Sequence, residues 1–162
     1  MDPNKAYAVG LGQIYFNLRG RESRGIVSAG AEYRALQKEI GAKLVGLADP
    51  DTGELVMRHV YAGDEIYKGE HLRDAPDLQV GFNDGYRVGW QDTPGGIART
   101  VIENNNRKWS GDHCATAGEI SGGVIFINRK IPPSPHIMDL APTVLKLLDV
   151  PLPEDLDGKP LF

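Results

Sequence analysis

The segment Glu32–Leu47, with the sequence EYRALQKEIGAKLVGL, decides the fold class because it predicts a long helix with one apolar face. Its charged residues fall mostly on the opposite side, and Gly41 and Gly46 each weaken the helix by about 1 kcal/mol relative to alanine. The apolar side chains recur every three or four residues, as on one side of an α-helix: Tyr33, Leu36, Ile40, Leu44 and Leu47. We therefore expect a helix over about 31–47.

Short runs of strand-forming residues lie on both sides of this helix. The segment Asn83–Gly85 predicts the turn of a hairpin, because its residues tolerate a positive φ. Residues 61–77 are polar and predict no regular element. An apolar run at Ala6–Val9 precedes the first of the predicted strands, which are Gln13–Leu18, Leu55–Val60, Leu78–Phe82 and Tyr86–Trp90.

Two apolar segments follow in the last quarter of the chain. The run Val124–Ile127 has four consecutive apolar residues between glycines and polar residues, which is typical of a strand buried on both faces of a sheet. A last helix is predicted over Ile137–Leu148, and we expect its apolar side chains to face inward: Leu140, Val144, Leu147 and Leu148. Strands and helices in this order predict an α/β fold.

The composition is that of an ordinary globular domain: 162 residues, 41% hydrophobic and 25% charged. Its single cysteine, Cys114, excludes an internal disulfide and a cysteine-rich zinc cluster. The net charge of −4 argues against a nucleic-acid partner. The sequence has no signal-peptide pattern and no apolar run near the ~20 residues that span a bilayer, so we expect a cytoplasmic protein without a membrane partner.

The strongest candidate for chemistry is the segment Trp109–Cys114, WSGDHC, which lies in a long polar loop before the predicted strand at 124–127. A neutral His113 imidazole can bind a metal ion or transfer a proton near neutral pH. Asp112 can be a second ligand, or can orient an imidazole by accepting its N–H. The Cys114 sulfur is a softer ligand. The same residues are also compatible with an ordinary polar loop.

Several blocks of the sequence resemble the C-terminal part of alkaline phosphatase superfamily hydrolases, in the branch of type I phosphodiesterases and nucleotide pyrophosphatases. The resemblance extends over nearly the whole chain, from Tyr7 to Leu161. The most specific blocks, in the order that the family has them, are Trp109–Cys114, Gly123–Arg129, Ile137–Leu148 and Asp157–Leu161. Further resemblance lies in Tyr7–Glu22 and in the stretch from Ala75–Leu78 through Gly85–Arg87.

The resemblance implies an alkaline-phosphatase-like mixed sheet with helices and a small α+β cap-like unit. The segments implied are core strands and a loop at 1–24, the cap-like unit at 25–90, and a C-terminal core segment at 91–162. The family holds two divalent metal ions, usually zinc, and hydrolyses phosphate esters. His113 is similar to the family's late metal-ligand histidine, which leaves Asp112 in a supporting position around the metal or in a purely structural role.

The sequence departs from the family by lacking the nucleophile and the earlier metal ligands, so the resemblance identifies no catalytic residue. We therefore expect the C-terminal part of a larger metal-dependent phosphodiesterase or phosphatase. Alone, this part should be inactive and should hold no metal tightly. A homo-oligomer is compatible with the sequence. The alternative is a non-catalytic binding or scaffolding α/β domain derived from the same family.

Overall fold

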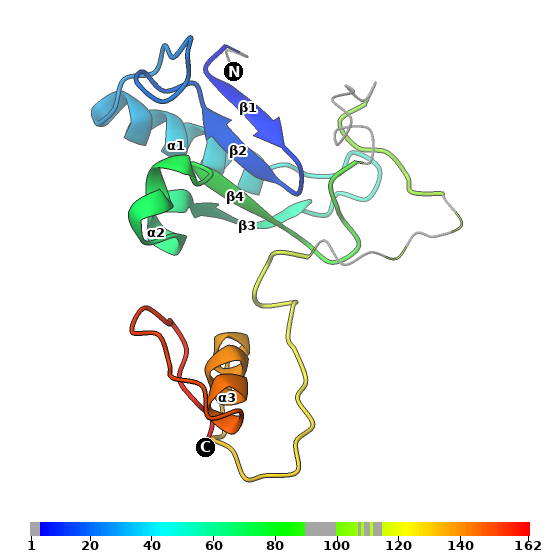
Figure 1. Ribbon diagram of the computed structural model, residues 1–162. Coiled ribbons are helices and arrows are strands. Elements are labelled where there is room, and N and C mark those ends of the chain that lie inside the picture. The colour runs from blue at the N-terminus through cyan, green and yellow to red at the C-terminus, as the bar shows by residue number, and fades with distance from the viewer. Residues whose placement is uncertain (1–3, 90–99, 107, 109–110, 112–114) are drawn as a thin grey trace. The chain divides into compact units, whose positions relative to one another are not determined.

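The computed structural model describes residues 4–89, 100–106, 108, 111 and 115–162 (Figure 1). It is a mixed α/β structure with one four-stranded antiparallel sheet and a few helices. The chain divides into two compact units, Met1–Ser121 and Gly122–Phe162. No helix among the described residues has both the length and the apolar character needed to cross a membrane.

The sheet belongs to the first unit, and its strands lie in the order β1-β2-β4-β3 with antiparallel neighbours. The strand β4, Leu78–Phe82, is central and buried along its whole length. Three predicted strands are thereby confirmed, β4 with the predicted ends and β2 and β3 with shifted ends, while the early apolar run forms the edge strand β1. The other bounds are Ala6–Val9 for β1, Gln13–Phe16 for β2 and Met57–Ala62 for β3.

The predicted long helix is confirmed as α1, Ala31–Val45. Its apolar face packs on the sheet, because Leu36 and Ile40 share a buried cluster with Phe16 of β2 and Leu78 of β4. A second cluster contains Val56, Met57, Val80 and Phe82. The spacing of apolar residues in α1 therefore fixes which side of the sheet the helix covers.

Two short helical elements occupy the segment for which the sequence predicted no regular structure. They are α2, Gly63–Ile66, and the 3-10 helix η1, Glu70–Asp74. Gly63 lies where only a glycine fits, because a Cβ there would overlap the carbonyl oxygen of Pro76. Its N–H donates to the Asp77 carbonyl oxygen at 2.9 Å, which joins the start of α2 to the segment that enters β4.

The second unit is built around one acidic side chain. Its helices are the 3-10 turn η2, Ile137–Asp139, and α3, Leu140–Leu147. The Asp139 carboxylate accepts the N–H of His136 at 2.8 Å and that of Lys159 at 3.0 Å. These two backbone hydrogen bonds hold the pKa of Asp139 below its usual value. The carboxylate therefore fastens the C-terminal segment to the start of the helix.

Thr143 of α3 makes a second connection inside this unit. Its Oγ1 donates to the Asp139 carbonyl oxygen at 2.5 Å and accepts the N–H of Leu161 at 2.9 Å. Both Thr143 and Leu161 are buried. Thr143 therefore joins α3 to the C-terminal segment through a buried hydrogen bond.

The predicted buried strand at Val124–Ile127 is wrong for the described structure. These residues form neither strand nor helix, and Val124 and Phe126 are 87% and 95% exposed. A strand needs a neighbour that supplies backbone hydrogen bonds. The described sheet has the strand order β1-β2-β4-β3 and does not include this run.

The predicted returning strand at Tyr86–Trp90 is also wrong where the structure describes it, since Tyr86–Gly89 form no strand and Trp90 lies outside the described residues. After the turn at Asn83, the Asn83 N–H donates to the Val56 carbonyl oxygen at 2.9 Å, which directs the chain to the segment before β3.

The predicted inward face of the last helix needs correction as well. In the structure α3 buries Pro142 and Thr143, and its apolar side chains are largely exposed: Leu140, Val144, Leu147 and, at its C-terminal cap, Leu148. The helix is therefore present close to its predicted position. Within this unit it contacts the C-terminal segment through Thr143, and not through the apolar face that the sequence predicted to be inward.

Residues 1–24 and 25–90 both contribute strands to the one sheet, since β2 pairs with β4. The boundary between the two compact units falls after Ser121, inside the 91–162 segment.

We predict that Gly158→Ala opens the second unit locally. A Cβ at this position would overlap the backbone of Met138 and Asp139, so the C-terminal segment must move away from η2. Hydrogen exchange of the Leu161 amide, which donates to Thr143, should become at least tenfold faster. The control is Gly122→Ala, whose Cβ meets nothing within 4 Å; equal exchange rates in the two variants would contradict the prediction.

Candidate functional site

The residues that the sequence singled out for metal chemistry, Asp112, His113 and Cys114, lie outside the described residues. The chain that follows them is described and is held on β4. Thr116 Oγ1 donates to the Val80 carbonyl oxygen at 2.6 Å, and Ala117 is fully buried. Sequence positions immediately after the candidate ligands are therefore part of the packed first unit.

Ala117 packs where β4 has a glycine. A Cβ at Gly81 would stand 3.2 Å from Ala117, so a side chain there would compete with this contact. Ser121 Oγ donates to the Ala117 carbonyl oxygen at 2.7 Å and fixes the turn that follows. These contacts fasten 116–121 to the sheet.

The other histidines are not gathered into a site. The His59 ring lies 4.5 Å from the Tyr61 ring between centroids, and His136 accepts the Met138 N–H as a helix cap. His71 is exposed, with Glu70 and Asp74 carboxylates 3.4 and 3.9 Å from its ring nitrogens. Within the described ranges, no three side chains of histidine, cysteine, aspartate or glutamate are grouped to hold a metal ion.

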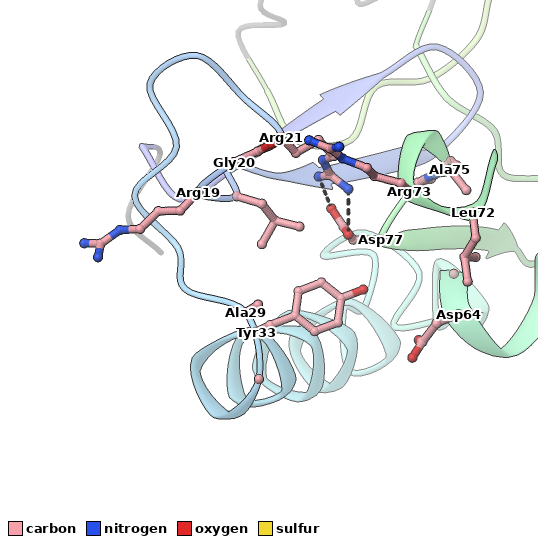
Figure 2. A pocket seen from close by; sticks show the side chains of 14 residues that line it. Arg19, Gly20, Arg21, Ala29, Tyr33, Asp64, Leu72, Arg73, Ala75 and Asp77 are labelled. Atoms are coloured by element: carbon pink, nitrogen blue, oxygen red, sulfur yellow. Dashed lines mark hydrogen bonds and ion pairs between the residues drawn. The ribbon is translucent and has the colours of Figure 1, made fainter. Parts of the chain in front are cut away.

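The structure instead shows a pocket of about 410 Å³ on the first unit, which we call the Tyr33 pocket (Figure 2). Four stretches line it: Leu18–Arg21 after β2, Ala29–Tyr33 at the entry of α1, Gly63 and Asp64 at the start of α2, and Leu72–Asp77 before β4. Gly20 and Gly30 have positive φ values of 84° and 87°, which glycine adopts without strain.

One wall of the Tyr33 pocket is an ion pair between Arg21 and Asp77 (Figure 2). Arg21 Nη2 and Nη1 donate to the two Asp77 oxygens at 2.6 and 3.1 Å. The Asp77 Oδ2 atom also accepts the Phe16 N–H at 2.5 Å, and Arg21 Nη2 donates to the Phe16 carbonyl oxygen at 2.7 Å. The Asp77 side chain is only 4% exposed.

Glu22 extends this pair into a triad. Arg21 Nε donates to Glu22 Oε1 at 2.7 Å, and the Leu18 N–H donates to Glu22 Oε2 at 2.7 Å. Burial lowers the pKa of the Arg21 guanidinium, but hydrogen bonds to Asp77 and Glu22 outweigh burial and raise it overall. Burial likewise opposes ionisation of Glu22, yet the bonds from Arg21 and Leu18 hold its pKa below the usual range. Both Arg21 and Glu22 therefore stay charged.

Two further polar side chains of the pocket are Asp64 and Tyr33. The Asp64 carboxylate is 2.5 Å from Arg34 Nη1 and accepts Gln37 Nε2 at 3.1 Å. Burial and the neighbouring carboxylates of Asp77 and Asp64 raise the pKa of the Tyr33 phenol, which therefore stays protonated. The lining thus combines arginines, two carboxylates and a phenol with apolar side chains.

Sequence reasoning missed this site. Arg21 lies between the strand predicted at Gln13–Leu18 and the helix predicted over 31–47, and Asp77 lies in the segment 61–77, which predicts no regular element. The available signal was the pair of blocks Tyr7–Glu22 and Ala75–Leu78, which both carry the family resemblance although 52 residues separate them. Opposite charges in two such blocks could have suggested a contact.

A scan of protein-family models, a search of curated proteins and a search of solved structures each found no match to this chain.

We predict that Asp77→Asn destabilises the protein by about 3 kcal/mol, because it leaves the largely buried Arg21 without its main partner. Urea unfolding followed by circular dichroism measures this change. The control is Glu39→Gln, which breaks an exposed pair with Lys43 on α1 and should cost about 0.5 kcal/mol or less. A loss equal to the control would show that the buried pair is not required.

Proposed function

We propose that this chain is the C-terminal part of a metal-dependent phosphoric ester hydrolase of the alkaline phosphatase superfamily, in the type I phosphodiesterase and nucleotide pyrophosphatase branch. The observation that carries the proposal is the series of sequence blocks that resemble the family and stand in its order, including the block with His113. The structure is compatible with this proposal, because blocks of the series are in contact in pairs.

Two such pairs are present. The block Tyr7–Glu22 is joined to Ala75–Leu78 through Arg21 and Asp77. The block Ile137–Leu148 is joined to Asp157–Leu161 through Asp139 and Thr143. Each contact uses a charged or hydroxyl side chain of one block and a group of the other, so the blocks form two folded units.

The exposed run Val124–Ile127 gives separate support for a larger protein. Four consecutive apolar residues are typical of a buried strand, yet Phe126 and Val124 are almost fully exposed here. The outer side chains of α3 are apolar and exposed in the same unit. The apolar run Val124–Ile127 and the helix α3 are therefore suited to join a mixed sheet of the alkaline-phosphatase type in a larger protein.

In this proposal His113 is a zinc ligand and Asp112 supports the site or the loop. The described residues by themselves do not fit a zinc ion, because they offer no group of three ligands. Stable zinc sites use three or four protein ligands. The ion would therefore need His113 together with ligands from outside the described residues, and we derive no reaction step through it.

A non-catalytic binding domain is the second candidate. The Tyr33 pocket favours it, because a cavity of about 410 Å³ lies within the size range of small-molecule sites and its lining has no nucleophile among histidine, cysteine and serine. The two candidates differ in whether the native protein hydrolyses phosphate esters.

We predict that the 162-residue chain alone, with excess zinc, hydrolyses bis(4-nitrophenyl) phosphate no faster than zinc in buffer. One imidazole cannot hold the ion tightly, and the family's nucleophile is absent from this sequence. The measurement is release of nitrophenolate by the purified chain and by His113→Ala. Turnover that His113→Ala abolishes would contradict the prediction.

The proposal itself is tested on the native protein. An antiserum against this chain should precipitate from the source cells a polypeptide longer than 162 residues. The precipitate should hydrolyse bis(4-nitrophenyl) phosphate, lose activity in EDTA and regain it with zinc. In the native gene, His113→Ala should reduce activity at least a hundredfold, while His71→Ala, which alters an exposed histidine of η1, should not.

Two results would contradict the proposal and favour the binding domain. One is a native polypeptide of 162 residues without hydrolytic activity. The other is a longer polypeptide whose activity is unaffected by both EDTA and His113→Ala.

A further inference from the structure

The Tyr33 pocket has the build of a ligand site that is independent of any metal. The aliphatic side chains of Leu18 and Leu72 and the ring of Tyr33 line it, together with Ala75 and Pro76. Binding sites for small organic molecules are mostly apolar, with a few polar groups that set orientation. The pocket therefore suits a small ligand with an apolar body.

The charges around the pocket favour an anion. Its two carboxylates already form ion pairs, Asp77 with Arg21 and Asp64 with Arg34. Arg73 differs from Arg21 and Arg34 because, in the described part of the chain, its guanidinium donates a hydrogen bond to a neutral group, the Gly20 carbonyl oxygen. Arg19, which also lines the pocket, points away from the other lining side chains in Figure 2. Among the described lining residues, Arg73 is therefore the arginine that lies near the other lining side chains and forms no ion pair with a carboxylate.

The pocket is held open by contacts within its walls. Arg21 and Asp77 fix the upper wall through two hydrogen bonds to each other and through bonds to Phe16. Gly63 fixes the start of α2 against Pro76 and Asp77. A site whose walls are set before binding loses less free energy to ordering when a ligand enters.

We propose that the Tyr33 pocket binds a small organic anion, with its charged group at Arg73 and an aromatic or aliphatic body between Tyr33, Leu18 and Leu72. A carboxylate and a phosphate ester share this chemistry. The inference does not rest on the proposed hydrolase, since it needs neither metal nor nucleophile.

The test is nuclear magnetic resonance titration of the full chain with phenyl phosphate in EDTA. Amide signals of Gly20, Gly30 and Ala75 should shift saturably, while signals of the second unit should not. Arg73→Gln should weaken binding about tenfold, because a hydrogen bond between two charged groups is lost. The matched control is Arg58→Gln, an exposed arginine of β3 that donates to Asn83 and should leave the affinity unchanged.

Ligand charge is tested without any variant. Benzylamine, which has a similar ring and a positive charge, should bind the same amides at least tenfold more weakly than phenyl phosphate. Ala29→Leu, which narrows the opening without changing charge, should weaken phenyl phosphate as well. The proposal is overturned if benzylamine binds equally well, if Arg73→Gln binds like the unaltered chain, or if the pocket amides do not shift. Because EDTA is present, these outcomes say nothing about hydrolysis.

Discussion

The ion pair between Arg21 and Asp77 is the interaction on which the first unit depends. Asp77 stands just before β4, and its carboxylate accepts the Phe16 N–H at the end of β2. A carboxylate in this place is costly to bury unless a cation accompanies it, and Arg21 supplies that cation with two hydrogen bonds. The pair thereby continues the pairing of the two central strands past the last backbone contact and forms a wall of the Tyr33 pocket.

Local patterns predicted the elements of the first unit well. The helix expected over 31–47 is Ala31–Val45 in the structure. Its apolar side chains recur on one face, and this face packs against the sheet. The strand Leu78–Phe82 has the predicted bounds, since its alternate residues Leu78, Val80 and Phe82 are apolar and buried. Such elements follow from residues close in sequence, so periodicity is enough to place them.

The errors concern features that depend on partners. Val124–Ile127 has the composition of a buried strand, but composition does not say whether a neighbouring strand pairs with the run, and the described four-stranded sheet does not include it. The exposed side of α3 was misjudged for the same reason, because Thr143 and Asp139 turn it toward the C-terminal segment. Arg21 and Asp77 lie 56 residues apart, and no local pattern couples such positions. His113 remains a prediction from resemblance.

The most direct test of the central claim is a double-mutant cycle on this pair. Free energies of unfolding are measured for the unaltered chain, Arg21→Gln, Asp77→Asn and the double variant. If the pair joins the end of β2 to the start of β4, the sum of the losses of unfolding free energy in the two single variants should exceed the loss in the double variant by about 2 kcal/mol or more. Additive losses, with a coupling below about 0.5 kcal/mol, would show that the two side chains act separately and would contradict the account.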